Sequence, residues 1–409
     1  MKILIINTSD IRGGAAIAAF RLMQGLNANG HQAKMMVREK LSDNDNVIRV
    51  GSNQANRWNF LAERGRIFAY NRFSRKNLFD VSTADSGIAV TTHPAFQETD
   101  VIHLHWINQG MLSLNEIGRI LASGKKVIWT MHDMWPFTGI CHHAAGCSSY
   151  ESGCGQCPYL SAPAYNDLSH HLFEQKRKSY AGGKITFVAC SHWLRELAAK
   201  SPLTAGHPIL SIPNPINTTQ YRPMDRREAR EKLGLPQEAK ILLFAAAKAS
   251  DPRKGTDYLA EASHILAEKR KDILILIAGS HGKEMQQQLS LPATCRGYVT
   301  PDDMPALYNA ADLFVTPSLQ ENLPNTIMEA MACGTPCVGF HTGGIPEMIS
   351  HQQNGYVARY RDAADLAQGI IWALQTSVWT QLSEKARTKA LHLYEQSVVV
   401  QQYIKVYHA

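Results

Sequence analysis

The chain lacks a long hydrophobic run: no apolar stretch approaches the ~20 residues that a membrane-spanning helix needs. It also lacks low-complexity segments, and its 44% hydrophobic and 19% charged residues exclude a disordered or fibrous protein. We expect no secretory leader in the opening stretch MKILIINTSD, because its apolar run is short and a polar turn follows at once. We therefore expect a globular, cytoplasmic protein whose first residues form a buried strand.

Cysteine content and net charge are both modest. In a reducing compartment, eight cysteines in 409 residues are better explained as thiols or metal ligands than as disulfides. The formal net charge of +7 is spread along the chain, which argues against nucleic acid and leaves nucleotides, phosphates or an acidic membrane face as partners. This length predicts two domains of roughly 150–200 residues each.

Residues 57–80, the basic–aromatic segment, are denser in charge than the rest. The charged ends of its arginine and lysine side chains and its aromatic rings suit a segment that lies peripherally on the inner face of the plasma membrane. The alternative, which we favour, is an amphipathic helix whose aromatics pack on its own domain. The residues concerned are Arg57, Trp58, Phe60, Arg64, Arg66, Phe68, Tyr70, Arg72, Phe73, Arg75, Lys76 and Phe79.

Short β-like runs alternate with helix-length segments along the chain. The first half contains KILIIN, AKMMV, DVIHLHW, KVIWTMHD and TFVACS, and the second KILLFAAA, ILILIAG, RGYV, DLFVTP, PCVGF and GYVA. Such alternation predicts right-handed crossovers and parallel sheets, hence an α/β protein with two doubly wound, Rossmann-like domains. In such domains a ligand is expected at the carboxyl ends of the strands, here in the cleft that the two sheets would share.

Changes in pattern suggest the domain boundaries. A proline-containing stretch without periodicity, residues 206–222, is typical of a linker. It separates a first domain, residues 1–205 with a Cys-rich insertion at 141–157, from a second domain at residues 223–376. Residues 377–409 are predicted to be helical. The sequence leaves open whether they cross back and pack against the first domain.

The most informative stretch is LFVTPSLQENLPNTIMEAMACGTPCVGF, residues 313–340. It predicts a strand, a loop that carries Glu321, and a helix that begins at Pro324 or Asn325, carries Glu329 and ends at Gly334. The N–H groups and positive dipole end of such a helix attract phosphates, and flanking carboxylates can bind hydroxyl groups. This combination suits a nucleotide-sugar.

With the stretches around it, this pattern resembles the retaining GT-B glycosyltransferases of family 4. The resemblance rests on the two glutamates, followed by AMACGTP and GGIPEMI, and on DVIHLHW, VIWTMHD, IPNPI and RKG in the family's order. The block HDMWPFTGICHH…CGQCP is similar to a narrower branch that includes colanic-acid and capsule enzymes. The resemblance to GT-B enzymes implies two Rossmann-like domains that face a central cleft, with residues 1–205 on the acceptor side and residues 223–376 binding the nucleotide-sugar.

The resemblance implies a donor site for a UDP- or GDP-sugar that needs no metal for catalysis. Lys254 matches the phosphate-binding lysine, and Lys248 or Arg253 would supply a second cation because FAAAKAS lacks the family's frequent Gly-Arg pair. Glu329 would hold the ribose, and Glu321 the hydroxyls of the donor sugar. The same site would include Asn322, Leu323 and Thr326.

In the first domain, His132 matches the family's histidine that reaches the donor sugar near the reaction centre. Gly13 and Gly14 would let their loop approach a diphosphate or acceptor closely. His105 is an acceptor-side candidate, with a core histidine as its alternative. Retention in this family is generally explained by front-face attack, in which the leaving diphosphate helps to remove the acceptor's proton, so we assign no general base.

A Gly- and Ser-rich loop contains four cysteines with the spacing Cys-x5-Cys-x6-Cys-x2-Cys. A structural zinc is the interpretation we favour, with His142 or His143 able to replace one thiolate. Free or redox-active thiols and disulfides are the alternatives. The loop would shape the region beside the cleft rather than perform chemistry. Its cysteines are Cys141, Cys147, Cys154 and Cys157.

We therefore expect a hexosyltransferase that acts on a glycan or polyprenyl-diphosphate-linked acceptor in exopolysaccharide, capsule or O-antigen biosynthesis. One alternative is a non-catalytic nucleotide-sugar-binding protein of the same fold. The other is an NAD-dependent oxidoreductase, which is disfavoured because NTSDIRGGAAIA lacks the G-x-G-x-x-G pattern of dinucleotide-binding loops.

Overall fold

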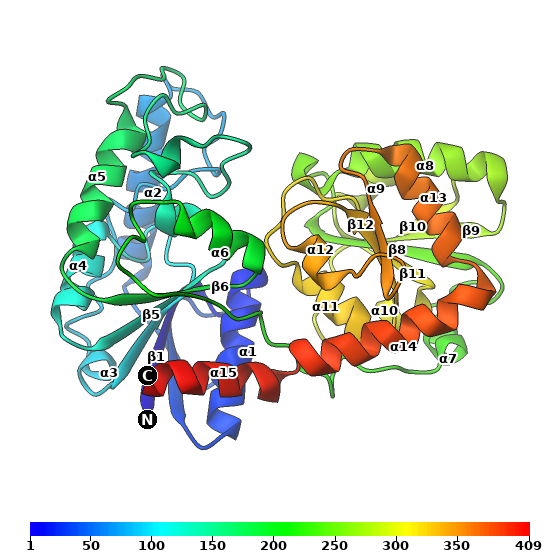
Figure 1. The fold of residues 1–409 in the computed structure, drawn as a ribbon, viewed down its shortest axis with the longest axis horizontal. Helices are drawn as coiled ribbons and strands as arrows, with labels where there is room; N and C mark the ends of the chain where they lie inside the picture. Colours follow the sequence, from blue (N-terminus) through cyan, green and yellow to red (C-terminus); the bar gives the residue numbers. More distant parts are fainter. The chain divides into compact units, whose positions relative to one another are not determined.

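The computed structural model describes every residue from Met1 to Ala409. The chain forms two compact units, of which the first comprises Met1–Pro213 and Val400–Ala409 and the second Asn214–Val399. Both ends of the chain therefore belong to the first unit (Figure 1). No helix combines the length and the apolar character that crossing a membrane requires.

A seven-stranded parallel sheet forms the centre of the first unit, in the order β3-β2-β1-β4-β5-β6-β7. Its inner strands are almost continuously apolar because helices cover both faces of a parallel sheet. The strand β7 lies within the predicted linker, which corrects that part of the linker prediction. The strands are β1 (Lys2–Ser9), β2 (Gln32–Glu39), β3 (Val47–Arg49), β4 (Val101–Leu104), β5 (Lys126–Met131), β6 (Ile185–Ala189) and β7 (Ile209–Ser211).

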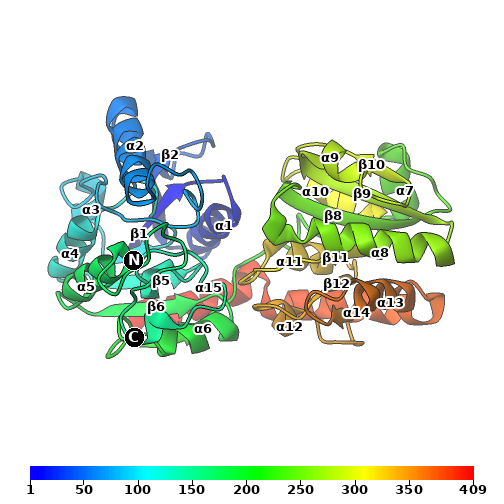
Figure 2. The ribbon, with the colours of Figure 1, turned by 90° about the horizontal axis from the view of Figure 1, so that it is seen from above.

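Helices connect these strands, and α4 and α5 lie side by side (Figures 1 and 2). The last helix, α15 (Gln396–His408), places Tyr403 and Tyr407 in the first unit, where their hydroxyls hydrogen-bond Thr130 and His103. The other helices are α1 (Gly14–Ala28), α2 (Asn53–Tyr70), α3 (Pro94–Gln97), α4 (Leu114–Ala122), α5 (Leu168–Tyr180) and α6 (His192–Ala199), with 3-10 turns η1 (Trp135–Phe137) and η2 (Ser149–Glu151).

The basic–aromatic segment begins inside α2 and continues ten residues beyond its end at Tyr70; α2 stands at the edge of the first unit in Figure 2. Trp58, Phe73 and Phe79 are 71%, 74% and 60% exposed. The favoured expectation, that the aromatics of this segment pack on their own domain, is therefore wrong for these three side chains.

The second unit contains a six-stranded parallel sheet in the order β10-β9-β8-β11-β12-β13. The predicted strand RGYV, residues 296–299, is not a strand, because the pairing ends with β10 just before it. The strands are β8 (Lys240–Lys248), β9 (Ile273–Ser280), β10 (Ala293–Cys295), β11 (Leu313–Thr316), β12 (Cys337–Phe340) and β13 (Gly355–Ala358).

In Figure 1, helices α8 and α13 lie on one side of the second sheet, and α10, α11 and α14 on the other. This is the doubly wound α/β arrangement that the alternating pattern predicts. The elements are α7 (Arg226–Lys232), η3 (Pro252–Lys254), α8 (Thr256–Lys269), α9 (Gly282–Gln286), α10 (Met304–Ala310), α11 (Asn325–Ala332), α12 (Ile345–Met348), α13 (Ala363–Ala373) and α14 (Thr376–Leu393).

Candidate functional site

Two loops at the carboxyl edge of the second sheet bring Lys254 and Glu321 together. The strands β8 and β11 are parallel neighbours, so the loops that follow them leave the sheet at the same edge. Lys254 ends η3, and its Nζ forms an ion pair with Oε1 of Glu321. The hydroxyl of Ser318 donates to the same oxygen at 3.1 Å, which helps to orient the carboxylate.

Two glycines allow this close approach of the loops. At Gly255, with φ of 67°, a Cβ would lie 1.8 Å from the carbonyl oxygen of Pro317. At Gly343, with φ of 54°, a Cβ would lie 1.6 Å from the carbonyl oxygen of Glu321. Any side chain at these positions would meet both a clash and a left-handed backbone, so the packing of these loops requires glycine.

Glu329 lies within α11 and is buried, with 6% of its surface exposed. The hydroxyl of Tyr308, on α10, donates to its Oε2 at 2.9 Å. Burial, and then the charge of Glu329, raise the pKa of Tyr308 well above its usual value, so the phenol stays a donor. The sequence analysis missed Tyr308 because no motif links it to the glutamate.

The start of α11 has no side-chain cap, since its N-cap residue is Pro324. Of the predicted donor-site residues, Asn322 and Leu323 are buried in the preceding loop, and Thr326 is half-buried in the first turn. These residues and Glu321 are therefore adjacent through the chain itself.

The two candidates for a second phosphate-binding cation have different surroundings. The guanidinium of Arg253 is held by Asp251, with Nη2 to Oδ2 at 2.7 Å and Nε to Oδ1 at 3.1 Å. Lys248, at the end of β8, is exposed and forms no ion pair. Lys248 is thus the candidate whose charge no carboxylate neutralises.

In the first unit, a cavity of about 540 Å³ lies at the carboxyl edge of the sheet. The loops after β1, β4 and β5, three adjacent strands, supply Gly13, Gly14, Trp106, His132 and Asp133 to its lining. The structure therefore brings together the glycine loop and the histidine that the sequence analysis selected. We call this space the reaction-side cavity.

His132 is a neutral imidazole in this environment. Burial lowers its pKa to about 4, although Asp133 acts in the opposite direction. Its Nε2 lies 2.9 Å from Nδ1 of His105, and its Nδ1 lies 3.6 Å from Sγ of Cys190. His105 is itself only 4% exposed, which favours the core alternative over an acceptor-side role.

Asp133 organises the wall of the reaction-side cavity. Burial would raise its pKa, but the imidazole of His142, 2.7 Å away, holds that pKa at about 2. The carboxylate also accepts hydrogen bonds from Nε1 of Trp106 at 2.8 Å and from the backbone N–H of Trp135 at 2.9 Å. The sequence analysis missed Trp106 and gave His142 a different role, because these contacts join three separate loops.

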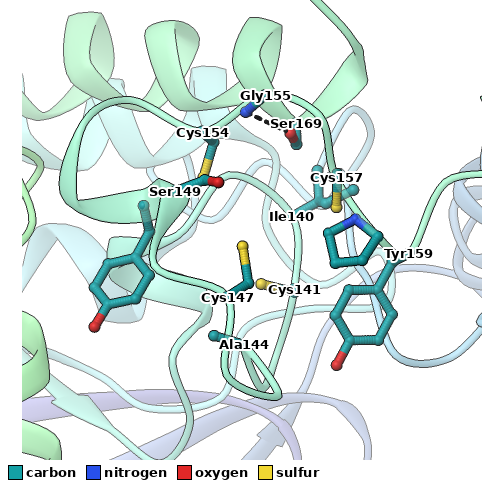
Figure 3. Close-up of a pocket in the computed structure, with 12 residues that line it drawn as sticks. Ile140, Cys141, Ala144, Cys147, Ser149, Cys154, Gly155, Cys157, Tyr159 and Ser169 are labelled. Carbon is teal, nitrogen blue, oxygen red and sulfur yellow. Dashed lines mark hydrogen bonds between the residues drawn. The ribbon is translucent and has the colours of Figure 1, made fainter. Parts of the chain in front are cut away.

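Four cysteines of the predicted knuckle surround a small cavity of about 20 Å³ in the first unit (Figure 3). All eight cysteines of the chain are free thiols. No group of three or more His, Cys, Asp or Glu side chains is arranged to hold a metal ion, so the predicted structural zinc gains no support. The loop is tied to α5 instead: the N–H of Cys157 donates to Asp167 at 2.7 Å, and that of Gly155 to Ser169 at 3.1 Å.

The chain has two doubly wound units with parallel sheets, which is the architecture of the GT-B class of glycosyltransferase. A cation and a carboxylate meet at the carboxyl edge of the second sheet. The chain belongs to glycosyltransferase family 4, whose sequence model matches residues 12–220. The model of the glycosyl transferases group 1 matches residues 239–376.

Curated relatives agree with this family. Glycosyltransferase EpsD of Bacillus subtilis is 24% identical over 311 residues, which cover 74% of this chain and 74% of EpsD. A D-inositol 3-phosphate glycosyltransferase of Catenulispora acidiphila is 31% identical over 179 residues, 39% of this chain and 41% of the relative. The chain thus spans less than half the length of that relative.

Solved structures share the fold along the whole chain. Sucrose-phosphate synthase from Thermosynechococcus elongatus superposes with a TM-score of 0.69 at 17% identity, covering 100% of this chain and 98% of that one. HepE of Anabaena in complex with UDP gives 0.66 at 17% identity, with 99% of each chain covered. At such identities the likeness establishes the fold alone.

Proposed function

We propose that the chain is a retaining hexosyltransferase that uses a UDP- or GDP-sugar and a glycan or lipid-linked acceptor. The observation that carries this proposal is the contact of Lys254 with Glu321 at the carboxyl edge of the second sheet. The two groups match the two parts of such a donor: a cation for the diphosphate and a carboxylate for the sugar hydroxyls. Glu329, oriented by Tyr308, would hold the ribose.

Transfer from such a donor builds negative charge on the departing diphosphate. Preorganised cations stabilise that charge at little cost, because they need not reorient during the reaction. Lys254 would exchange part of its pairing with Glu321 for the diphosphate, which frees the carboxylate for sugar hydroxyls. Lys248 is the favoured second cation because no carboxylate neutralises it, and Arg253 is the alternative.

In the first unit, the reaction-side cavity would receive the acceptor. His132 would contact the donor sugar as a neutral hydrogen-bonding group, since its lowered pKa keeps it uncharged at neutral pH. The glycine loop at Gly13 and Gly14 would let backbone N–H groups approach the substrate. No side chain is assigned as a general base, because the leaving diphosphate would take the acceptor's proton.

The biological setting we propose is the synthesis of a cell-surface glycan at the inner face of the plasma membrane. The exposed Trp58, Phe73 and Phe79, with the arginines beside them, support a peripheral membrane contact.

A thermal-shift panel of UDP, GDP, ADP, CMP and NAD tests the proposal. One nucleoside diphosphate should raise the melting temperature, and Lys254→Ala should reduce that shift while NAD produces none. Transfer should then be sought with sugars on the nucleotide that binds, by following release of the diphosphate. Stabilisation by NAD alone would overturn the proposal, and nucleotide binding without transfer would favour the non-catalytic alternative.

A further inference from the structure

A second cavity, of about 380 Å³, lies in the first unit among β2, β3 and α2. Four basic side chains line it: Arg38 from β2, Lys40 just after it, Arg49 from β3, and Arg57 from α2. We call it the cationic cavity. Of these four residues, only Arg38 also lines the reaction-side cavity described above.

The charge of the cationic cavity is largely uncompensated. Its one lining carboxylate, Glu39, is already paired with Arg12 at 2.7 Å. Two of the cations have neutral hydrogen-bond partners: Arg38 donates to the carbonyl oxygen of Gln109, and Arg49 to the side-chain oxygen of Asn53. The charges of Glu39 and Glu63 also act on Arg38, but Glu63 is itself paired with Arg64 at 3.2 Å.

Lys40 and Arg57 form no ion pair. Like charges that share a concave surface repel one another and concentrate counter-ions, so such a cavity favours an anionic ligand. The guanidinium group of arginine can donate two parallel hydrogen bonds to the oxygens of a phosphate. A ligand with two or more negative charges also neutralises four cations better than a single carboxylate does.

The cationic cavity adjoins the reaction-side cavity. Arg38, Glu39 and Phe60 line both of them. A ligand that extends past these three side chains would have one end beside His132 and the other among the four cations. The ring of Phe60, with the guanidinium of Arg38 5.6 Å from its centroid, lies where the two spaces meet.

We infer that the acceptor carries a phosphate or diphosphate group, which the cationic cavity binds while the reacting hydroxyl lies in the reaction-side cavity. This inference rests on the proposed function. It narrows the acceptor from glycans in general to phosphorylated ones, and it assigns Arg49 and Arg57 to acceptor specificity.

The test compares the wild type with the double variant Arg49→Ala/Arg57→Ala. The matched control is Arg75→Ala/Lys76→Ala, which removes the same charge from exposed positions of the same unit outside the cavity. Inorganic pyrophosphate is titrated calorimetrically in the presence of saturating UDP and GDP, so that the donor site is filled. Acetate serves as the carboxylate probe.

Wild type and control should bind pyrophosphate equally, and the double variant at least tenfold more weakly. Equal affinities in all three proteins, or acetate binding as tight as pyrophosphate, would overturn the inference. Binding to phosphatidylglycerol vesicles tests whether the cavity instead contacts a lipid headgroup. If only the double variant loses vesicle binding while its pyrophosphate binding is unchanged, the cavity is a membrane contact and the inference is overturned. The nucleotide panel without pyrophosphate reports separately on the proposed function.

Discussion

Nδ1 of His105 lies 2.9 Å from Nε2 of His132, and the two rings stack at 27° with their centroids 5.2 Å apart. Two facing lone pairs or two facing N–H groups would repel at this distance. One of the two nitrogens therefore carries a proton and donates it in a hydrogen bond to the other. The tautomers of the two histidines are therefore coupled. On its other face His105 contacts His103, whose ring nitrogens hydrogen-bond Thr130 and Tyr407, both at 2.8 Å.

This contact predicts that His105→Phe lowers turnover by about tenfold, because His132 loses a buried hydrogen bond worth ~1–3 kcal/mol and its defined tautomer. Nucleotide affinity should stay unchanged, since the residues proposed to bind the donor nucleotide lie in the other unit. His105→Asn, which keeps a polar group near Nδ1, should retain more activity.

Ring ¹⁵N NMR of His132 gives a readout that simple destabilisation does not change. The wild type should show one tautomer and His105→Phe a mixture, while His264→Gln, at a position 71% exposed, should resemble the wild type. An unaltered His132 spectrum in His105→Phe would contradict the coupling.

Glu321→Gln should reduce transfer by roughly 100-fold, the scale of losing a group that stabilises the transition state. Nucleotide affinity should change little, because the carboxylate is assigned to sugar hydroxyls. Single-turnover transfer and calorimetric binding of the nucleotide measure the two effects separately. A parallel collapse of nucleotide affinity would limit Glu321 to a binding role.

Lys176 should make stability depend on pH. It is fully buried, and its Nζ donates to the carbonyl oxygens of Trp135 at 2.5 Å and Thr138 at 2.9 Å. Burial lowers its pKa from 10.5 to about 7, although nearby thiols and Asp133 act in the opposite direction. Between these two values the unfolded chain holds a proton that the folded chain lacks, so stability rises with pH.

Urea unfolding at pH 7 and pH 9 measures this contribution. In Lys176→Met the increase in unfolding free energy between these values should be smaller than in wild type by about 2 kcal/mol. Lys178→Met, on the exposed face of the same helix, is the control. Identical slopes in Lys176→Met and wild type would show that Lys176 stays charged.

Three knuckle thiols should react slowly in the folded protein. Burial raises the pKa of Cys141, Cys154 and Cys157 to about 12. Because the thiolate is the nucleophile, their alkylation by iodoacetamide at pH 8 should be at least ~100-fold slower than in the unfolded chain. Peptide mass spectrometry follows each site.

The same experiment examines the zinc interpretation. Alkylation that a chelator accelerates, with zinc found by metal analysis and lost in Cys154→Ser, would support a zinc knuckle. Native alkylation as fast as in the unfolded chain would contradict the burial of the thiols.

The alternation of apolar strands with helices was sufficient to predict two doubly wound α/β domains. Strands of a parallel sheet are buried on both faces, so each one is a short run of apolar residues that can be recognised in the sequence. The order Glu321, Pro324, Glu329, Gly334 likewise predicted the loop and helix of the proposed donor site, since capping and helix length are local properties. These features depend on neighbouring residues, so the sequence by itself determined them.

Contacts between distant segments were decided only by the tertiary structure. The sequence contains no signal that pairs Tyr308 with Glu329, His105 with His132, or Arg57 with Arg38, because each pair meets through strand order and helix packing. The exposed aromatics of the basic–aromatic segment show the same limit: the sequence pattern predicts an apolar face, but only the packed domain decides whether other residues cover it.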